Sequence, residues 1–352
     1  MQLSSRVKNA VKDFPPGYFA MVMATGIISA ASQQLHYALI AQALFLLNNV
    51  LYFIILIITV IRLFLFYQQV KADLANHATG AGFLTFVAAS CILGTGYVQG
   101  QHLFSPAIWL LVVAIIAWLI LVYSFLPLVI LKKEKPSPEK GLNGSWLLLV
   151  VAIQSPTILA ASLASHVSLA TTISFFIALC SWLLGILLYV VILTLIVYRL
   201  LFYPVNAAEV SPSFWIDTGA AAISVLAGVT LIHAFAGTPD YDAYIPVIRI
   251  IILLLWAAAT FWLPLLLILE TWRHYKAGFS YSPAYWSMVF PLGMYTIATL
   301  QLASVVPMHF LDALANAFIY VAWAAWLIVF IGMIVHLFKS FISLKTIHKA
   351  SS

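Results

Sequence analysis

The chain has 352 residues, of which 64% are hydrophobic and only 7% are charged, and its formal net charge is +6. So few charged side chains exclude an ordinary soluble globular protein of this length and predict an all-α integral membrane protein. The apolar runs are continuous rather than alternating, which argues against a membrane β-barrel.

Taken in chain order, the hydropathy predicts ten transmembrane helices, because a helix that crosses the hydrocarbon core needs roughly 20 apolar residues. The connections are short, so the helices form one transmembrane domain over residues 15–337. A basic N-terminus (1–14) precedes this domain, and a C-terminal tail (338–352) follows it. The predicted helices span roughly 15–34, 39–61, 80–99, 107–131, 144–163, 171–198, 213–234, 246–269, 284–304 and 313–337.

Lysine and arginine mark one side of this predicted domain. They occur before the first helix and after even-numbered helices, as at Arg62 and Arg199, whereas the opposite connections contain neither residue. Basic residues gather on the cytosolic side of membrane proteins. We therefore predict a multi-pass protein of the cell (inner) membrane with both termini in the cytosol.

The odd-numbered predicted helices begin alike, with small or helix-breaking residues followed by an aromatic side chain. These marker aromatics are 63 to 71 residues apart, which is one helical hairpin each time. Aromatic residues also mark membrane interfaces, but that does not account for the small residues before them. The period therefore indicates a repeated unit. The marker aromatics are Phe19, Phe83, Trp146, Trp215 and Trp286.

The two helices of each hairpin differ in composition. Odd-numbered helices are rich in Gly, Ala, Ser and Thr, whereas even-numbered helices are bulkier. Small residues let helices approach closely in a membrane, and bulky aliphatic residues suit a surface in lipid. The sequence therefore predicts five helical hairpins, with an inner five-helix pore surrounded by five outer helices. Interruptions at Pro156 and Pro291 would favour a lumen, and dense packing without a lumen is the alternative.

Three stretches, FPPGYFAMVMATGIIS, WIDTGAAAIS and SPAYWSMVFPLGMYTIATLQLA, resemble the tellurite-resistance/dicarboxylate transporter family. That family includes bacterial tellurite-resistance proteins, fungal malate and sulfite transporters and the plant guard-cell slow anion channel. The similarity runs over nearly the whole chain. It implies ten helices in five hairpins, and a homotrimer with one pore per subunit. It also implies a phenylalanine gate on a kinked helix, which corresponds here to Phe290 just before Pro291.

The repeat predicts which residues share the height of this gate. Positions four residues after a marker aromatic lie on the same helix face, and among them Phe290 is the only aromatic residue while Gly219 leaves space. One large residue among smaller ones suits a plug, although ordinary packing of Phe290 is the alternative. The gate-level positions are Met23, Val87, Val150, Gly219 and Phe290. Continuing the same faces predicts as further pore-lining residues Gly26, Ser90, Gln154, Ala222, Gly293 and Met294.

The predicted lining is neutral and lacks the acidic ring that a cation pathway often has. Five parallel helices also direct their positive dipole ends toward the basic cytosolic mouth. We therefore predict an anion channel or transporter for small inorganic or C4-dicarboxylate anions. Its expected surroundings are the lipid bilayer, with no nucleic acid, metal or cofactor. The alternatives are a proton-coupled carrier of C4-dicarboxylates or of sulfite and tellurite, and a membrane-embedded enzyme that uses dispersed outer histidines.

Two intramembrane charges are candidates for coupling or for a charge pair. Asp217 lies about 200° around its helix from the predicted pore face. We expect it to face an outer helix or the cytosolic interface with a neutralising partner, and proton coupling is the alternative. Arg249 is expected to pair with Asp240, Asp242 or Asp312, or to attract anions to the outer mouth.

Overall fold

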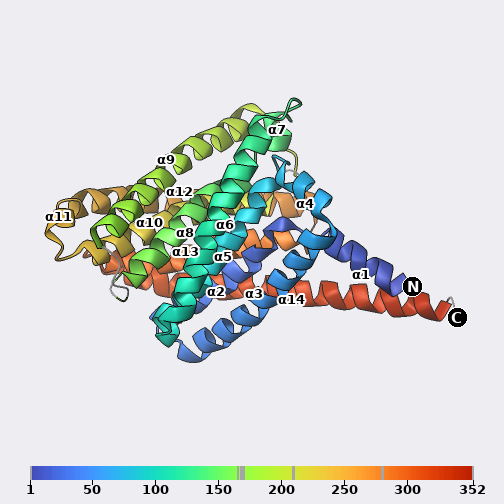
Figure 1. Cartoon of the computed structure of the whole chain (residues 1–352), viewed down its shortest axis with the longest axis horizontal. Helices are drawn as coiled ribbons and strands as arrows, with labels where there is room; N and C mark the ends of the chain where they lie inside the picture. The colour runs from blue at the N-terminus through green and yellow to red at the C-terminus, as the bar shows by residue number, and fades with distance from the viewer. Residues whose placement is uncertain (1, 165, 167–170, 208–210, 279–280, 351–352) are drawn as a thin grey trace.

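The computed structural model describes residues 2–164, 166, 171–207, 211–278 and 281–350, and every regular element within these ranges is helical (Figure 1). One set of long helices, called the ring helices, follows the odd-numbered segments of the sequence. They are α2 (Ala20–Gln34), α5 (Thr85–Gln101), α8 (Leu148–Leu163), α10 (Ile216–Phe235) and α13 (Trp286–Ala303). The peripheral helices alternate with them and are α3 (Ala38–Leu65), α6 (Phe104–Ile130), α9 (Thr171–Phe202), α12 (Ile245–Ala277) and α14 (Phe310–Ala350).

Eight helices of the described chain are long and apolar enough to cross a membrane. They comprise the five peripheral helices and, with their first turns, the ring helices α5, α8 and α10. The ring helices α2 and α13 are not among them, and they are only 15 and 18 residues long. In its most apolar stretch each peripheral span is 17 to 28% buried, whereas each of the three ring spans is 72 to 78% buried.

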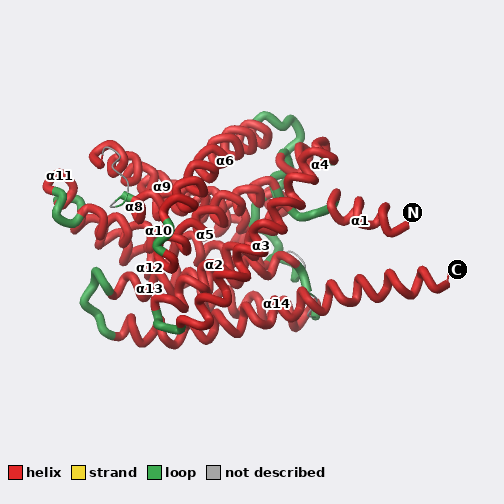
Figure 2. Tube along the Cα trace, turned by 60° about the horizontal axis from the view of Figure 1, so that its bottom comes forward, coloured by secondary structure: helices red, strands yellow, loops and turns green. Residues whose placement is uncertain are grey.

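The ring helices contact one another in a closed cycle. α2 contacts α5, α5 contacts α8, α8 contacts α10, α10 contacts α13, and α13 contacts α2. Each ring helix also packs against the long peripheral helix that follows it in the chain, from α2 with α3 to α13 with α14. Figure 2 shows α14 along one edge of the bundle, beside α13 and α2.

Each ring helix begins with a short 3₁₀ turn, and these turns also contact one another in a closed cycle. All ring helices therefore start at the same end of the molecule and run parallel. Every marker aromatic lies within such a turn or, for Trp286, directly after it. The turns are η1 (Pro16–Phe19), η2 (Gly80–Leu84), η3 (Gly144–Leu147), η4 (Pro212–Trp215) and η5 (Pro283–Tyr285).

Glycines permit the close approach of these elements. A Cβ atom added at Gly144 would lie 2.0 Å from the carbonyl oxygen of Ser213, so η3 can touch η4 only without a side chain there. A Cβ atom at Gly94 would lie 2.6 Å from Leu159 on the neighbouring ring helix. Small residues thus bring ring helices within backbone distance of their neighbours, as expected in a membrane.

The backbone continues through the two prolines that were predicted to interrupt it. α8 contains Pro156 and α13 contains Pro291, and each is one continuous α-helix. Each proline removes a single backbone hydrogen bond, and the surrounding packing retains the others, so the kinks expected at these positions stay a prediction. The peripheral helices α6 and α12 also contain prolines, Pro127 and Pro264, so a proline does not distinguish a ring helix.

Arginines near the ends of three peripheral helices contact segments that follow these helices in the chain. Arg199 of α9 lies over the ring of Phe214 in η4, and Arg273 of α12 lies over the ring of Tyr285 in η5. Arg62 of α3 pairs with Asp73 in α4 (Tyr67–Leu74). These contacts attach α9 and α12 to the first turns of the next ring helices, and α3 to the connection before η2.

Both ends of the chain are helical where they are described. α1 (Gln2–Lys12) forms part of the segment predicted as a basic N-terminus, and α14 continues through residues 338–350 of the predicted tail. Both helices extend past the bundle at the same end of the molecule in the two views (Figures 1 and 2). Short helices in the connections are α7 (Pro138–Gly141) and α11 (Pro239–Asp242).

Candidate functional site

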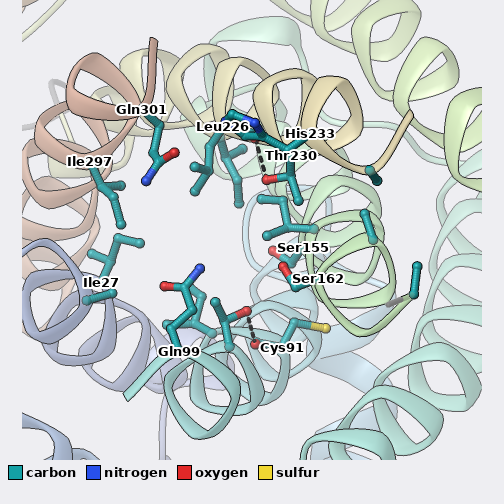
Figure 3. A pocket seen from close by; sticks show the side chains of 18 of the residues that line it. Ile27, Cys91, Gln99, Ser155, Ser162, Leu226, Thr230, His233, Ile297 and Gln301 are labelled. Atoms are coloured by element: carbon teal, nitrogen blue, oxygen red, sulfur yellow. Dashed lines mark hydrogen bonds between the residues drawn. The ribbon is translucent and has the colours of Figure 1, made fainter. Parts of the chain in front are cut away.

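A cavity of about 500 Å³ lies among the ring helices and is lined by all five of them (Figure 3). It extends toward their C-terminal ends, where the rim is formed by Gln99, His233 and Gln301. At its inner end each ring helix contributes a residue near its middle. These residues are Ile27, Cys91, Ser155, Ile223 and Met294.

The lining changes from apolar to polar along the cavity. The inner half carries isoleucine and leucine side chains, including Ile158, Leu226 and Ile297, whereas the rim carries amide, hydroxyl and imidazole groups. None of the described residues that line the cavity is Asp, Glu, Lys or Arg. A solute in this space therefore meets hydrogen-bonding groups at the rim and no fixed charge of either sign.

Hydroxyl groups in the lining donate to the backbone of their own helices. Thr95 donates to the carbonyl of Cys91 (3.0 Å), Ser155 to that of Val151 (2.7 Å), and Thr230 to that of Leu226 (2.8 Å). Such bonds to the fourth preceding carbonyl satisfy a hydroxyl inside a helix. Donors for a bound ligand must therefore come mainly from other groups.

His233 contacts the serine that follows α13. Its Nε2 atom lies 3.0 Å from the hydroxyl oxygen of Ser304, which also lies 2.7 Å from the backbone carbonyl oxygen of Gln301. A hydroxyl has one proton to donate, so Ser304 donates to one of these two neighbours at a time.

The predicted gate residue is buried on α13, one helical turn before the cavity-lining Met294. Phe290 is 1% exposed, and its Cε1 atom would be 3.2 Å from a Cβ atom added at Gly219. Its ring therefore rests against the backbone of α10 at the one gate-level position without a side chain. Pro291 follows it and is also close to Gly219. The other gate-level residues, Met23, Val87 and Val150, are buried.

Of the six residues predicted to line the path beyond the gate, Met294 lines the cavity. Four of the others make contacts between helices. Ser90 bonds to Tyr52 of α3 (2.9 Å), Gln154 donates to the backbone of α9 (3.1 Å), Gly26 faces Asn48 and Ile92, and Gly293 faces Ile27 and Ile28. Ala222 is buried outside the lining as well.

The lining prediction is thus displaced by one residue at this height. The cavity is lined by the residue that follows each predicted one, as Cys91 follows Ser90 and Ser155 follows Gln154. The physical reason is that the buried polar groups of Ser90 and Gln154 need hydrogen-bond partners. The Ser90 hydroxyl and the Gln154 amide nitrogen make such contacts with α3 and α9, so the next position on each ring helix faces the cavity.

The two candidate charges lie away from the cavity lining. Asp217 is 3% exposed and accepts a hydrogen bond from Tyr189 of the peripheral helix α9 (3.0 Å). It therefore faces a peripheral helix, as expected. Arg249 is exposed on α12, and no ion pair joins it to Asp240, Asp242 or Asp312 in the described structure. The expected role of Arg249 stays a prediction.

Sequence reasoning missed a set of polar residues at the rim, called the polar belt. Each belt residue follows a marker aromatic by 15 or 16 positions. Continuing the count from the marker aromatics further along each helix would therefore have found these residues. All five are polar, and four of them line the cavity. The belt consists of Gln34, Gln99, Ser162, Thr230 and Gln301.

The dispersed ionisable residues form no evident catalytic or metal centre in the described structure. Groups of three or more His, Cys, Asp or Glu side chains that could hold a metal ion are absent from the residues described. Cys91 and Cys180 are both free, the first in the cavity lining and the second exposed on α9.

Comparison with known proteins matches residues 13–334 to the voltage-dependent anion channel family, SLAC1. A membrane protein of Mycobacterium tuberculosis, itself uncharacterised, is 32% identical over 152 residues, which are 43% of this chain and 77% of the relative. An uncharacterised transporter of Methanocaldococcus jannaschii is 24% identical over 333 residues, covering 91% of this chain and 92% of the relative. The sulfite efflux pump SSU1 of Trichophyton rubrum is 28% identical over 353 residues, covering 91% and 90%.

These names are those of membrane proteins, channels and transporters rather than of enzymes. The family match spans every ring helix and most of the last peripheral helix, so it includes all the elements that line the cavity. This chain is a multi-pass membrane protein and belongs to the SLAC1 family of anion transporters.

Proposed function

We propose that the chain moves small anions through a path enclosed by the five ring helices, with the five peripheral helices facing lipid. All ten helices cross the membrane in this arrangement, as five hairpins, and both termini lie in the cytosol. The closed cycle of ring contacts supports it, as does the contrast in burial between the two sets of helices. The short helices α2 and α13 complete the wall with the help of their preceding 3₁₀ turns.

The observation that carries the proposal is the uncharged cavity that ends one helical turn from Phe290. An anion can enter from the polar rim without meeting a carboxylate. It then reaches an apolar section where the benzyl ring of Phe290, held against Gly219, occludes the path. The side chains at the same height are smaller, so displacement of one ring opens the passage.

Small inorganic anions are the preferred substrates, with sulfite among them. The sulfite efflux pump of Trichophyton rubrum matches this chain over nine-tenths of its length, which supports that substrate class. C4-dicarboxylates fit a cavity of about 500 Å³, but its described lining contains no cation to balance two carboxylates. A channel is preferred to a proton-coupled carrier, because Asp217 bonds to Tyr189 outside the cavity lining.

The proposed functional unit is a homotrimer with one path in each subunit, as the family resemblance implies. Mass measurement of the detergent-solubilised protein, corrected for bound detergent, tests this assembly. If the protein is a monomer and still transports anions, the proposed path within one subunit stands and the proposed homotrimer is wrong.

Replacing Phe290 with alanine tests the path directly. In proteoliposomes we expect Phe290→Ala to raise anion flux about tenfold or more, since lowering a barrier by about 1.4 kcal/mol already has that effect. The matched control is Phe125→Ala, which removes an equally buried ring from the peripheral helix α6. Reversal potentials with chloride, nitrate and sulfite should follow the anion gradient. Cation-selective currents in Phe290→Ala, or equal flux in both variants, would contradict the proposal.

A further inference from the structure

Three glutamines of the polar belt form a chain of hydrogen bonds across three ring helices. Gln301 of α13 donates from Nε2 to Oε1 of Gln34 in α2. Gln34 in turn donates from Nε2 to Oε1 of Gln99 in α5, over 3.4 Å. The chain therefore has a direction, with Gln99 as the last member and its amide nitrogen as the terminal donor.

The amide nitrogen of Gln99 has no acceptor among the residues that the structure describes. Gln301 uses one of the two protons on its nitrogen in the chain, and the second proton is unused within the same residues. Both side chains project into the cavity, and the nitrogen of Gln99 points toward its middle (Figure 3). Two helices thus offer unused N–H donors to one space.

The direction of the chain strengthens its last donor. An amide whose oxygen accepts a hydrogen bond becomes a better donor through its nitrogen, and successive bonds polarise one another. Gln99 receives such a bond from Gln34, which receives one from Gln301. Gln34 does not line the cavity itself, and its effect is to orient and polarise the two glutamines that do.

We propose that the polar belt is an oxyanion-binding site, in which the amide nitrogens of Gln99 and Gln301 hold a small polyatomic oxyanion and Gln34 is a positioning residue. This site rests on the proposed transport function only for its physiological role, as a binding site along the anion path. Binding itself can be measured without transport.

The placement of the donors on two helices favours an oxyanion over a halide. A halide presents a single acceptor atom to the donors of Gln99 and Gln301, which line the cavity from α5 and α13. An anion with two or three oxygens can accept hydrogen bonds from α5 and α13 together. Nitrate and sulfite have this shape, and neutral N–H donors bind either without a fixed countercharge.

Ligand-dependent thermal unfolding of the purified full chain tests binding without transport. Nitrate, sulfite and chloride are titrated at constant ionic strength, because a ligand that binds the folded state stabilises it by mass action. We expect the wild-type protein to bind both oxyanions more tightly than chloride. Gln99→Leu and Gln301→Leu should each weaken nitrate and sulfite binding about tenfold, since a hydrogen bond to a charged group is among the stronger ones, and leave the chloride response unchanged.

The chain offers a matched control two residues further along the same helix. Gln101 lies at the same end of α5, donates to Gln42 of α3 (2.9 Å) and is not part of the cavity lining. Gln101→Leu therefore makes the same chemical change outside the site and should leave all three affinities as in the wild type. Gln34→Leu should weaken oxyanion binding by about threefold, because the two contacting amides remain but lose their orientation.

Equal oxyanion affinity in Gln99→Leu, Gln301→Leu and the wild type would overturn the inference, as would an equal loss in Gln101→Leu. Unfolding midpoints without ligand identify a variant that fails to fold. Such a leucine variant is replaced by Gln99→Asn or Gln301→Asn, which keeps the amide but shortens its reach. Oxyanion binding that depends on Gln99 in a protein without anion flux would support this site and contradict the proposed function. The Phe290→Ala variant could instead conduct anions with a nitrate-to-chloride flux ratio that adding Gln99→Leu does not change. That result would support the proposed function and contradict this site.

Discussion

The ring helices and the peripheral helices reverse the distribution of polarity found in soluble proteins. Ring spans have mean hydropathies of 1.6 to 1.9 and are largely buried, whereas peripheral spans have values of 2.4 to 2.7 and are mostly exposed. The most apolar helices therefore lie outside, where lipid solvates them. The interior holds smaller and more polar residues, because close helix contacts and a polar cavity rim require them.

This contrast means that the same substitution has a different effect in each region. In a ring helix it meets the cavity or a neighbouring backbone. In a peripheral helix most positions are exposed, so a new side chain meets few neighbours within the chain. Three paired substitutions measure this difference.

The two cysteines give the largest expected difference. Cys91 lines the cavity on α5, and Cys180 is exposed on α9. In the Phe290→Ala background we expect Cys91→Trp to lower anion flux about 100-fold, since an added barrier of about 2.7 kcal/mol has that effect. Cys180→Trp should leave flux unchanged. Proteoliposome flux, with size-exclusion profiles to confirm folding, measures both. Similar flux in the two variants would mean that Cys91 is remote from the path.

Two glycines give an intermediate difference, in stability rather than flux. A Cβ atom at Gly228 of α10 would lie 2.4 Å from Ile252 and 2.9 Å from Trp182, whereas one at Gly332 of α14 would lie 3.2 Å from Tyr281. We expect Gly228→Ala to lower the free energy of unfolding by about 1–3 kcal/mol through overpacking. Gly332→Ala should change it by less than about 1 kcal/mol, because helix propensity offsets the milder contact. Unfolding curves in one detergent compare the variants, and an equal loss would contradict the close packing of α10.

Two leucines give the smallest expected difference. Leu159 of α8 is fully buried against Gly94, and Leu254 of α12 is 69% exposed. Leu159→Ile should lower the free energy of unfolding by about 1 kcal/mol, because the shape changes at constant volume in a packed site. Leu254→Ile should change it by less than about 0.5 kcal/mol. The same unfolding measurement applies, and a larger effect at Leu254 would indicate that α12 packs against another subunit.

The sequence predicted the order of the ten long helices, because hydropathy and the marker aromatics are local signals, but the ends of α12 and α14 lie beyond the predicted residues 269 and 337. Each marker aromatic coincides with a 3₁₀ turn at the start of a ring helix. The facing of individual residues depends instead on distant partners. Ser90 bonds to Tyr52, and Gln154 donates to the backbone carbonyl of Trp182. The residues next to Ser90 and Gln154 in the sequence do not predict these contacts.

The polar belt shows the opposite case, in which the signal was present and unused. Its residues share one spacing from the marker aromatics, so the repeat that located the gate level also located the rim. What the spacing does not provide is the hydrogen-bond order among Gln301, Gln34 and Gln99. That order depends on the contact between the first and last ring helices.

That last contact has a consequence for biosynthesis. Gln34 and Gln301 are 267 residues apart, so the contact that closes the cycle of ring helices cannot form until α13 has been synthesised. Because such long-range contacts form late, the ring can close only after nearly the whole chain has been made. A chain that ends before α13 would keep the first four ring helices but could not enclose the cavity, which α13 lines at Met294, Ile297 and Gln301.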